Sequence, residues 1–143
     1  MLSLVEKLNQ ALRENRPDDF VTEQHRALGM RPLQFGPGTS LWEWDATQEP
    51  VLNVFGYVAG GHLTVFADEL LGSAIGSVLD TGELATTAEL KISFLKPVAK
   101  GLLRGEGRVI RKGKRVAFLE AIVKNAKDEI VATVSSTWTV VSG

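Results

Sequence analysis

The sequence predicts an α+β domain in which one long apolar helix covers one face of an antiparallel sheet. Residues 61–79 carry apolar side chains nearly all round the expected helix, which is typical of a helix enclosed by the rest of its protein. Apolar and polar side chains alternate in four later segments, residues 85–95, 102–111, 115–124 and 130–141. Two further strands, MRPLQF and TSLWEWDA, precede the helix and are expected to pair through the turn GPG.

The connections predict how these elements follow one another. The links KPVAKG, KGK and NAKDE are short and hairpin-like, which predicts that the last four strands form an antiparallel meander. Apolar residues at helical spacing near the start, and a second short helix over residues 18–28 that stops at Gly29, predict a helical N-terminal segment, residues 1–28. We therefore expect one domain over residues 1–143.

The composition excludes several classes of protein. The chain has 143 residues, no cysteine and two histidines, His25 and His62, so cysteine chemistry is excluded and no metal site is expected. The start lacks the basic head and apolar run of a secretory signal. Asp68 and Glu69 interrupt the most apolar stretch before it reaches membrane-spanning length. We expect a cytoplasmic protein with no cofactor and no membrane partner.

The charges are unevenly distributed along the chain. Residues 1–90 hold five Lys or Arg and 13 Asp or Glu, whereas residues 91–143 hold 11 and four. This asymmetry indicates either that the C-terminal half binds an anionic group or that basic and acidic faces neutralise each other. Aromatic residues do not alternate with the basic ones, so nucleic acid is not an expected partner.

One stretch, NVFGYVAGGHLTVFAD, combines an amide, a pair of glycines and a single acid. Asn53 comes first, Gly60 and Gly61 open the predicted helix, and Asp68 lies two turns inside it. A carboxylate in an apolar helix is costly to desolvate, so it is rarely found there without a use. This stretch is the predicted functional site.

The residues of this stretch and their spacing resemble the hotdog-fold acyl-CoA thioesterases. The resemblance is to the branch that includes the phenylacetate-degradation and 4-hydroxybenzoyl-CoA thioesterases, and it covers residues 29–141. That branch reads Asn-x-x-Gly-x-x-His-Gly-Gly, six residues, then Asp, which is matched here from Asn53 to Asp68 except that Ala59 replaces the histidine. A second motif, Ser/Thr-x-Asp/Glu-x-x-Ile-x-Phe/Tyr-x-x-Pro, is matched from Thr87 to Pro97. His62 lies three residues after Ala59 and does not simply replace the family histidine.

The resemblance implies a hotdog fold, in which the sheet wraps round the central helix. It implies hydrolysis of an acyl-CoA to a free carboxylic acid and coenzyme A without a metal. Asp68 would be the base or nucleophile, Asn53 would place water or substrate beside Gly60, and Thr87 would hold water or the carboxylate. The family forms homodimers, often paired into homotetramers, with two sites at each dimer interface.

The residue types suit this chemistry. A helix start offers unpaired backbone N–H groups to a carbonyl that gains negative charge, and Gly60 and Gly61 allow a thioester to approach the backbone closely. Eight residues of helix place Asp68 ~12 Å from Gly60, too far for both to contact one carbonyl. A twofold dimer with antiparallel central helices would bring Asp68 of one copy to Gly60 of the other.

The turn RKGKR contains the predicted contacts to coenzyme A. Lys112, Lys114 and Arg115 would bind its phosphates through charge-assisted hydrogen bonds. The alternative is an ordinary solvated hairpin.

Plainer interpretations stand beside the other assignments. Asp68 would then be a partly exposed helix residue, with Glu69 as the rival base, and the glycine pair would only mark the start of the helix. Asn53 favours turns and Thr87 favours strands. At the level of function, Ala59 motivates a non-hydrolytic module that binds acyl-CoA or an acyl carrier. A hotdog dehydratase or hydratase would need a histidine that the motif lacks.

Overall fold

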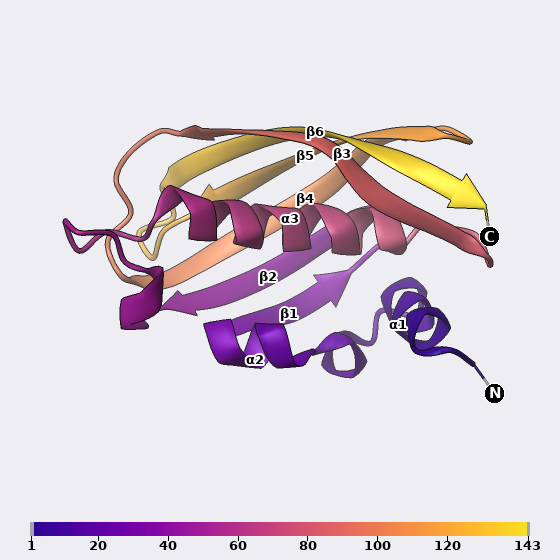
Figure 1. Cartoon of the computed structure of the whole chain (residues 1–143), viewed down its shortest axis with the longest axis horizontal. Helices are drawn as coiled ribbons and strands as arrows, with labels where there is room; N and C mark the ends of the chain where they lie inside the picture. The colour runs from indigo at the N-terminus through magenta and orange to yellow at the C-terminus, as the bar shows by residue number, and fades with distance from the viewer. Residues whose placement is uncertain (1, 143) are drawn as a thin grey trace.

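A curved antiparallel sheet wraps round one long helix, α3 (Gly60–Gly76), as the sequence predicts (Figure 1). The computed structural model describes residues 2–142. The strands all belong to one sheet, and every neighbouring pair runs antiparallel. They are β1 (Met30–Phe35), β2 (Thr39–Ala46), β3 (Glu83–Phe94), β4 (Gly101–Lys112), β5 (Val116–Lys124) and β6 (Ile130–Ser142).

The strand order is β1-β2-β4-β5-β6-β3, so the predicted meander is wrong at the link KPVAKG. Strand β3 pairs with β6 at an edge of the sheet and not with β4. Because the sheet curls round α3, the link passes the start of that helix on its way to β4 (Figure 1). The loop before α3 holds the link, since the Val58 N–H donates to the Val98 carbonyl at 2.8 Å and Tyr57 bridges Ala99.

The core lies between α3 and the inner face of the sheet. The helix is enclosed because its side chains are apolar in nearly every direction. Close packing requires a glycine on the facing strand: a Cβ on Gly107 of β4 would lie 2.2 Å from the Leu70 carbonyl oxygen. The helix ends at Gly76, three residues earlier than predicted. Its buried residues are Leu63, Phe66, Ala67, Leu70, Leu71, Ser73, Ala74, Ile75 and Gly76.

Strand β2 fixes the position of α3 by hydrogen bonds as well as by packing. Buried and more exposed residues alternate along this strand, and Trp42 and Trp44 are fully buried on the side that faces the helix. The Trp42 Nε1–H donates to the Ser73 hydroxyl at 2.9 Å, and the Ser40 hydroxyl donates to the Leu70 carbonyl at 2.6 Å. These buried hydrogen bonds fix the rotation of α3 about its own axis relative to the sheet.

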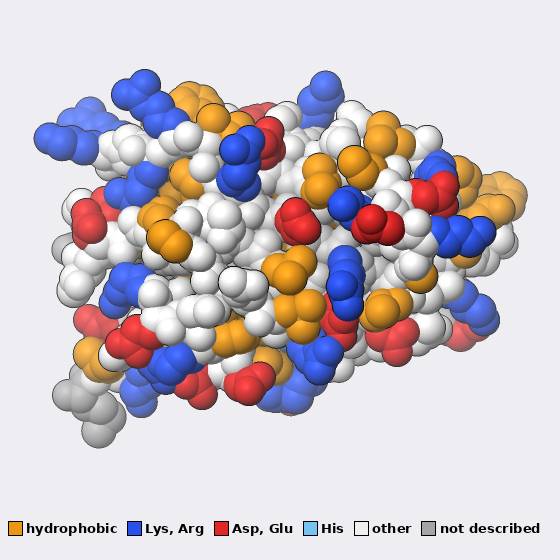
Figure 2. Space-filling view, turned by 180° about the vertical axis from the view of Figure 1, so that it is seen from behind, with side chains coloured by type: hydrophobic (Ala, Val, Ile, Leu, Met, Phe, Trp, Pro, Cys, Tyr) orange, Lys and Arg blue, Asp and Glu red, His pale blue; other side chains and the backbone are white. Residues whose placement is uncertain are grey.

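The outer face of the sheet carries charges of both signs among scattered apolar side chains (Figure 2). Arg108 of β4 is paired with Glu120 of β5, and Arg31 of β1 with Glu43 of β2. Cross-strand pairs of this kind link neighbouring strands on a face that the helix does not cover.

The N-terminal segment forms three short helices instead of the two predicted. They are α1 (Leu4–Arg13), the 3-10 turn η1 (Pro17–Phe20) and α2 (Glu23–Leu28), and a second 3-10 turn, η2 (Glu49–Val51), follows β2. The expected helix over residues 18–28 is divided into η1 and α2, because Thr22 caps the start of α2 and the chain is not helical between the two. Gly29 confirms the predicted stop, with φ +78° in the left-handed region that favours glycine.

Candidate active site

Asp68 lies in the middle of α3 and is bonded to Thr87 of the adjacent edge strand. The Thr87 hydroxyl donates to Asp68 Oδ1 at 2.7 Å. Asp68 is half-buried and Thr87 is exposed, so the carboxylate is not sequestered within a single chain. The pair lies beside an irregularity in β3, where the register with β6 shifts between Thr87 and Glu89. The acid and the hydroxyl that the sequence predicts to act together are therefore in direct contact.

Asn53 occupies a tight turn in the loop before α3. Its carboxamide oxygen accepts the backbone N–H groups of Phe55 at 2.9 Å and Tyr57 at 3.1 Å. Its own backbone exchanges hydrogen bonds with Tyr57 and Gly56. The turn role expected of asparagine is thus present, and it points the carboxamide nitrogen away from these backbone donors.

The first turn of α3 presents free donors. Ala59 is the N-cap and provides no side-chain hydrogen bond, while the N–H groups of His62 and Leu63 both donate to the Ala59 carbonyl. Within residues 2–142, the N–H groups of Gly60 and Gly61 donate to no protein acceptor. A Cβ on Gly61 would meet nothing within 4 Å, so this stretch of backbone is open to a ligand. Unpaired N–H groups at a helix start can donate to an oxygen atom that gains negative charge.

A hollow of about 540 Å³ adjoins these donors. One wall comes from the loop before α3, with Asn53, Phe55 and Tyr57, and the other from the end of β3 and its link, with Phe94 and Leu95. Most of its lining is apolar, with an amide and backbone donors at one end, which is the usual composition of a small-molecule site. This hollow could not be predicted from the sequence, because its two walls lie about forty residues apart in the chain.

The two halves of the predicted site do not meet within one chain. Asn53, Gly60 and Gly61 lie together at the start of α3, and Asp68 lies with Thr87 two turns further along. The helical rise puts ~12 Å between Gly60 and Asp68, whereas one reacting carbonyl requires contacts of ~3 Å.

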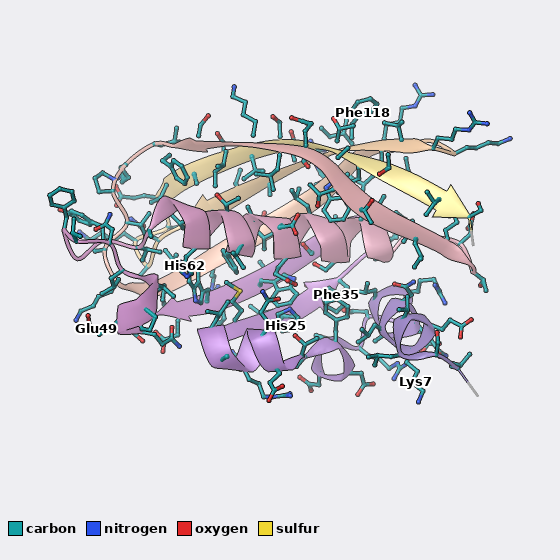
Figure 3. All side chains as sticks on the ribbon, viewed as in Figure 1. Lys7, His25, Phe35, Glu49, His62 and Phe118 are labelled. Atoms are coloured by element: carbon teal, nitrogen blue, oxygen red, sulfur yellow. The ribbon has the colours of Figure 1, made fainter. Side chains whose placement is uncertain are left out.

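Glu69, the rival base, faces the opposite side of α3 and is bonded to a buried histidine. His25, labelled in Figure 3, lies below α3. Its Nε2 is 2.7 Å from Glu69 Oε2, and its ring packs against Phe20 and Trp42. The Thr22 backbone N–H donates to His25 Nδ1 at 3.0 Å, so Nδ1 is an acceptor and Nε2 carries the hydrogen that is donated to Glu69. Thr22 followed three residues later by His25 has the spacing of a capping box, which could have indicated the start of α2 but not the contact with Glu69.

The basic turn lies at the far end of the molecule from the loop before α3 (Figure 1). Lys112 is paired with Glu83 of β3 at 3.0 Å and is mostly covered, whereas its contact with a phosphate stays a prediction. Lys114 and Arg115 are exposed at the tip. Lys and Arg side chains gather at this end of the surface (Figure 2).

His62 lies on the first turn of α3, half-buried, and has no side-chain hydrogen bond within residues 2–142 (Figure 3). No cluster of three His, Asp or Glu side chains suited to a metal occurs among these residues. None of the helices described is both long and apolar enough to cross a bilayer.

A sheet wrapped round a central helix, with an acid inside that helix and free donors at its start, defines a hotdog-fold thioesterase. The comparisons with known proteins agree, because the Thioesterase superfamily matches residues 55–132, more than half of the chain. The chain belongs to the Thioesterase superfamily, and it is a thioester hydrolase.

Individual relatives extend the likeness to almost the whole chain. An inferred esterase of Saccharolobus solfataricus, SSO1253, is 30% identical over 142 residues, covering 98% of this chain and 87% of the relative. The structure of an inferred thioesterase from Ralstonia eutropha, related to phenylacetic acid degradation, is 28% identical with a TM-score of 0.79 and covers 93% of this chain and 98% of its own. The protein smu.793 of Streptococcus mutans, solved bound to acetyl-CoA, shares the fold with 24% identity, a TM-score of 0.73 and coverage of 79% and 89%.

Proposed function

We propose that this thioesterase hydrolyses acyl-CoA to a free carboxylic acid and coenzyme A, with Asp68 as the general base or the nucleophile. The observation that carries the proposal is the contact between Asp68 and Thr87, because it holds a carboxylate on the helix in one orientation. Coenzyme A as the carrier is supported by the acetyl-CoA bound to the Streptococcus mutans protein of the same fold. Location in the cytoplasm stays a prediction.

The site is completed by a second copy of the chain. In a twofold dimer with antiparallel α3 helices, Asp68 and Thr87 of one protomer face Gly60, Gly61 and Asn53 of its partner. Strand β3 favours such a pairing, since it is a long strand at the edge of the sheet and carries an exposed apolar residue, Leu84. Pairs of these dimers would form the homotetramer.

The chemistry follows from this arrangement. The thioester oxygen accepts hydrogen bonds from Gly60 and Gly61, so negative charge on the tetrahedral intermediate is stabilised. Asp68 takes a proton from water as the water oxygen bonds to the carbonyl carbon, or its carboxylate attacks that carbon directly. Breaking the C–S bond releases the coenzyme A thiolate, which takes up a proton. As a nucleophile, Asp68 would form a mixed anhydride that water then cleaves.

The histidine of the family motif is Ala59 here, and the backbone at the start of α3 supports a mechanism that needs no imidazole. Ala59 acts as the N-cap of α3 through its backbone alone. The carbonyl is therefore polarised by backbone donors and not by an imidazole, and Thr87 orients the acid.

Release of thiol from a panel of aliphatic and aromatic acyl-CoAs tests the proposal. Asp68→Asn should lower kcat by ~10²–10⁴-fold, the usual contribution of a general base, with the fold unchanged by circular dichroism. Glu69→Gln is the matched control, because it makes the same change on the next residue and Gln retains an oxygen for His25. Activity lost with Glu69→Gln but kept with Asp68→Asn would overturn the assignment, and binding of acyl-CoA without turnover would overturn the function.

A further inference from the structure

The hollow beside Gly60 is not lined by Asp68. Its walls are the loop before α3 and the end of β3 with the link that follows. The Val58–Val98 hydrogen bond of 2.8 Å and the Tyr57–Ala99 bridge join its two sides, so its shape is set by the backbone. Phe94, at the end of β3, is half-exposed and lines it. The absence of a side chain on Gly60 lets the Phe94 ring lie flush against the start of α3, since a Cβ there would be 3.0 Å from Phe94 Cζ.

The charges in this hollow decide which part of a thioester fits it. Lys96, the one cation among the described residues that line the hollow, is paired with Glu129 at 2.6 Å, so its charge is compensated at the rim. Phe55, Leu63 and Leu95 supply apolar surface, which offers few partners to the amides of pantetheine. The negative phosphates of the coenzyme A nucleotide are instead complementary in charge to Lys114 and Arg115, which are exposed at the opposite end of the molecule. The apolar walls of the hollow and the compensated charge at its rim are suited to binding the hydrocarbon chain of the acyl group.

We propose that the hollow receives the acyl group and that Phe94 selects against substrates branched at the carbon next to the thioester carbonyl. This inference rests on the proposed acyl-CoA hydrolysis. When the carbonyl oxygen is bonded to Gly60, the first acyl carbon is the part of the substrate nearest the Phe94 ring. A methyl branch on that carbon occupies the space that the ring fills, whereas an unbranched chain passes along the ring into the hollow.

The test compares butyryl-CoA with 2-methylbutyryl-CoA, which differ only in this branch. The wild-type enzyme should prefer butyryl-CoA in kcat/KM, and Phe94→Ala should reduce the preference by ~10-fold, the effect of one well-packed methyl group. Phe94→Leu should give a smaller reduction, and it keeps the test valid if the alanine variant does not fold. Phe118→Ala is the matched control, because Phe118 is equally exposed but lies on the outer side of the sheet, away from α3 (Figure 3).

Inhibition by free coenzyme A shows whether the hollow holds the acyl group or the pantetheine arm. If it holds the acyl group, the inhibition constant Ki of coenzyme A should be the same for Phe94→Ala as for the wild type. A raised Ki with an unchanged substrate ratio would overturn the inference in favour of pantetheine, and an unchanged ratio with an unchanged Ki would overturn it outright. If neither substrate is cleaved by the wild-type enzyme, the proposed function fails and not this assignment alone.

Discussion

The Thr87 hydroxyl donates to Asp68 Oδ1 at 2.7 Å, which joins the edge strand β3 to the middle of α3. No donor among residues 2–142 bonds to the second carboxylate oxygen, which is the atom that the proposed mechanism uses. Removing the hydroxyl in Thr87→Ala should lower kcat by ~10–100-fold, as expected for a hydrogen bond to a charged group, with little change in KM. Thr87→Ser should retain most of the activity, and equal losses in the two variants would show that the hydroxyl is not the active feature.

The exposed end of the basic turn should act on binding and not on chemistry. Lys114→Ala combined with Arg115→Ala should raise KM for acyl-CoA ~10-fold at low salt with kcat unchanged, and the effect should shrink as ionic strength screens the charges. Steady-state kinetics at two salt concentrations measures both quantities. A KM that does not change, or a loss that does not depend on salt, would show that the turn is an ordinary solvated hairpin.

Lys112 forms an ion pair with Glu83, unlike the exposed Lys114 and Arg115. This pair predicts how the stability of the fold depends on pH. The Asp80 N–H and the Lys112 ammonium hold the pKa of Glu83 below its ordinary value near 4.5. A lowered carboxyl pKa stabilises the folded state above the unfolded pKa, and this contribution is lost as the pH falls from about 4.5 through the folded pKa.

Glu83→Gln should therefore reduce the free energy of unfolding at pH 6, and its difference from the wild type should shrink at pH 4 and again at pH 3. Urea unfolding at these three pH values measures the difference. Because other carboxylates titrate alike in both proteins, a difference that stays constant with pH would contradict the assignment.

Glu69 is expected to stabilise the fold through His25. Glu69→Ala leaves the Nε2–H of an imidazole that is only 2% exposed without an acceptor. This should reduce the free energy of unfolding by ~1–3 kcal/mol, the cost of an unpaired buried polar group. The folded fraction should keep its kcat, since Glu69 faces away from Thr87. Chemical denaturation and kinetics on one preparation separate the two effects, and a loss of kcat without a loss of stability would refute the structural role.

Most of the fold could be predicted because local patterns determine it. The all-round apolar residues of α3 and the alternation within each strand are visible in the sequence, and their bounds agree to within a few residues. The place of β3 could not be predicted in this way. Its link to β4 is as short as a hairpin, and only the curl of the whole sheet round α3 shows that it passes the start of the helix.

For the candidate site, the sequence indicated which residues lie near one another, while their roles stay predictions. Thr87 and Asp68 were assigned by resemblance, and their contact confirms that they lie together. The pairing of Lys112 with Glu83 joins residues 29 positions apart, and that of His25 with Glu69 joins residues 44 apart. Such partners depend on tertiary packing, so neither pair follows from the local sequence.

Mixing two inactive variants tests whether each active site is shared between two chains. Gly61→Val places a side chain in the open space at the start of α3, and Asp68→Asn removes the acid. Each variant alone should be inactive. A heterodimer purified with two different tags contains one site with both residues intact, so it should recover about half of the wild-type kcat per dimer. A heterodimer as inactive as its parents, or full activity from a wild-type monomer, would contradict the shared site.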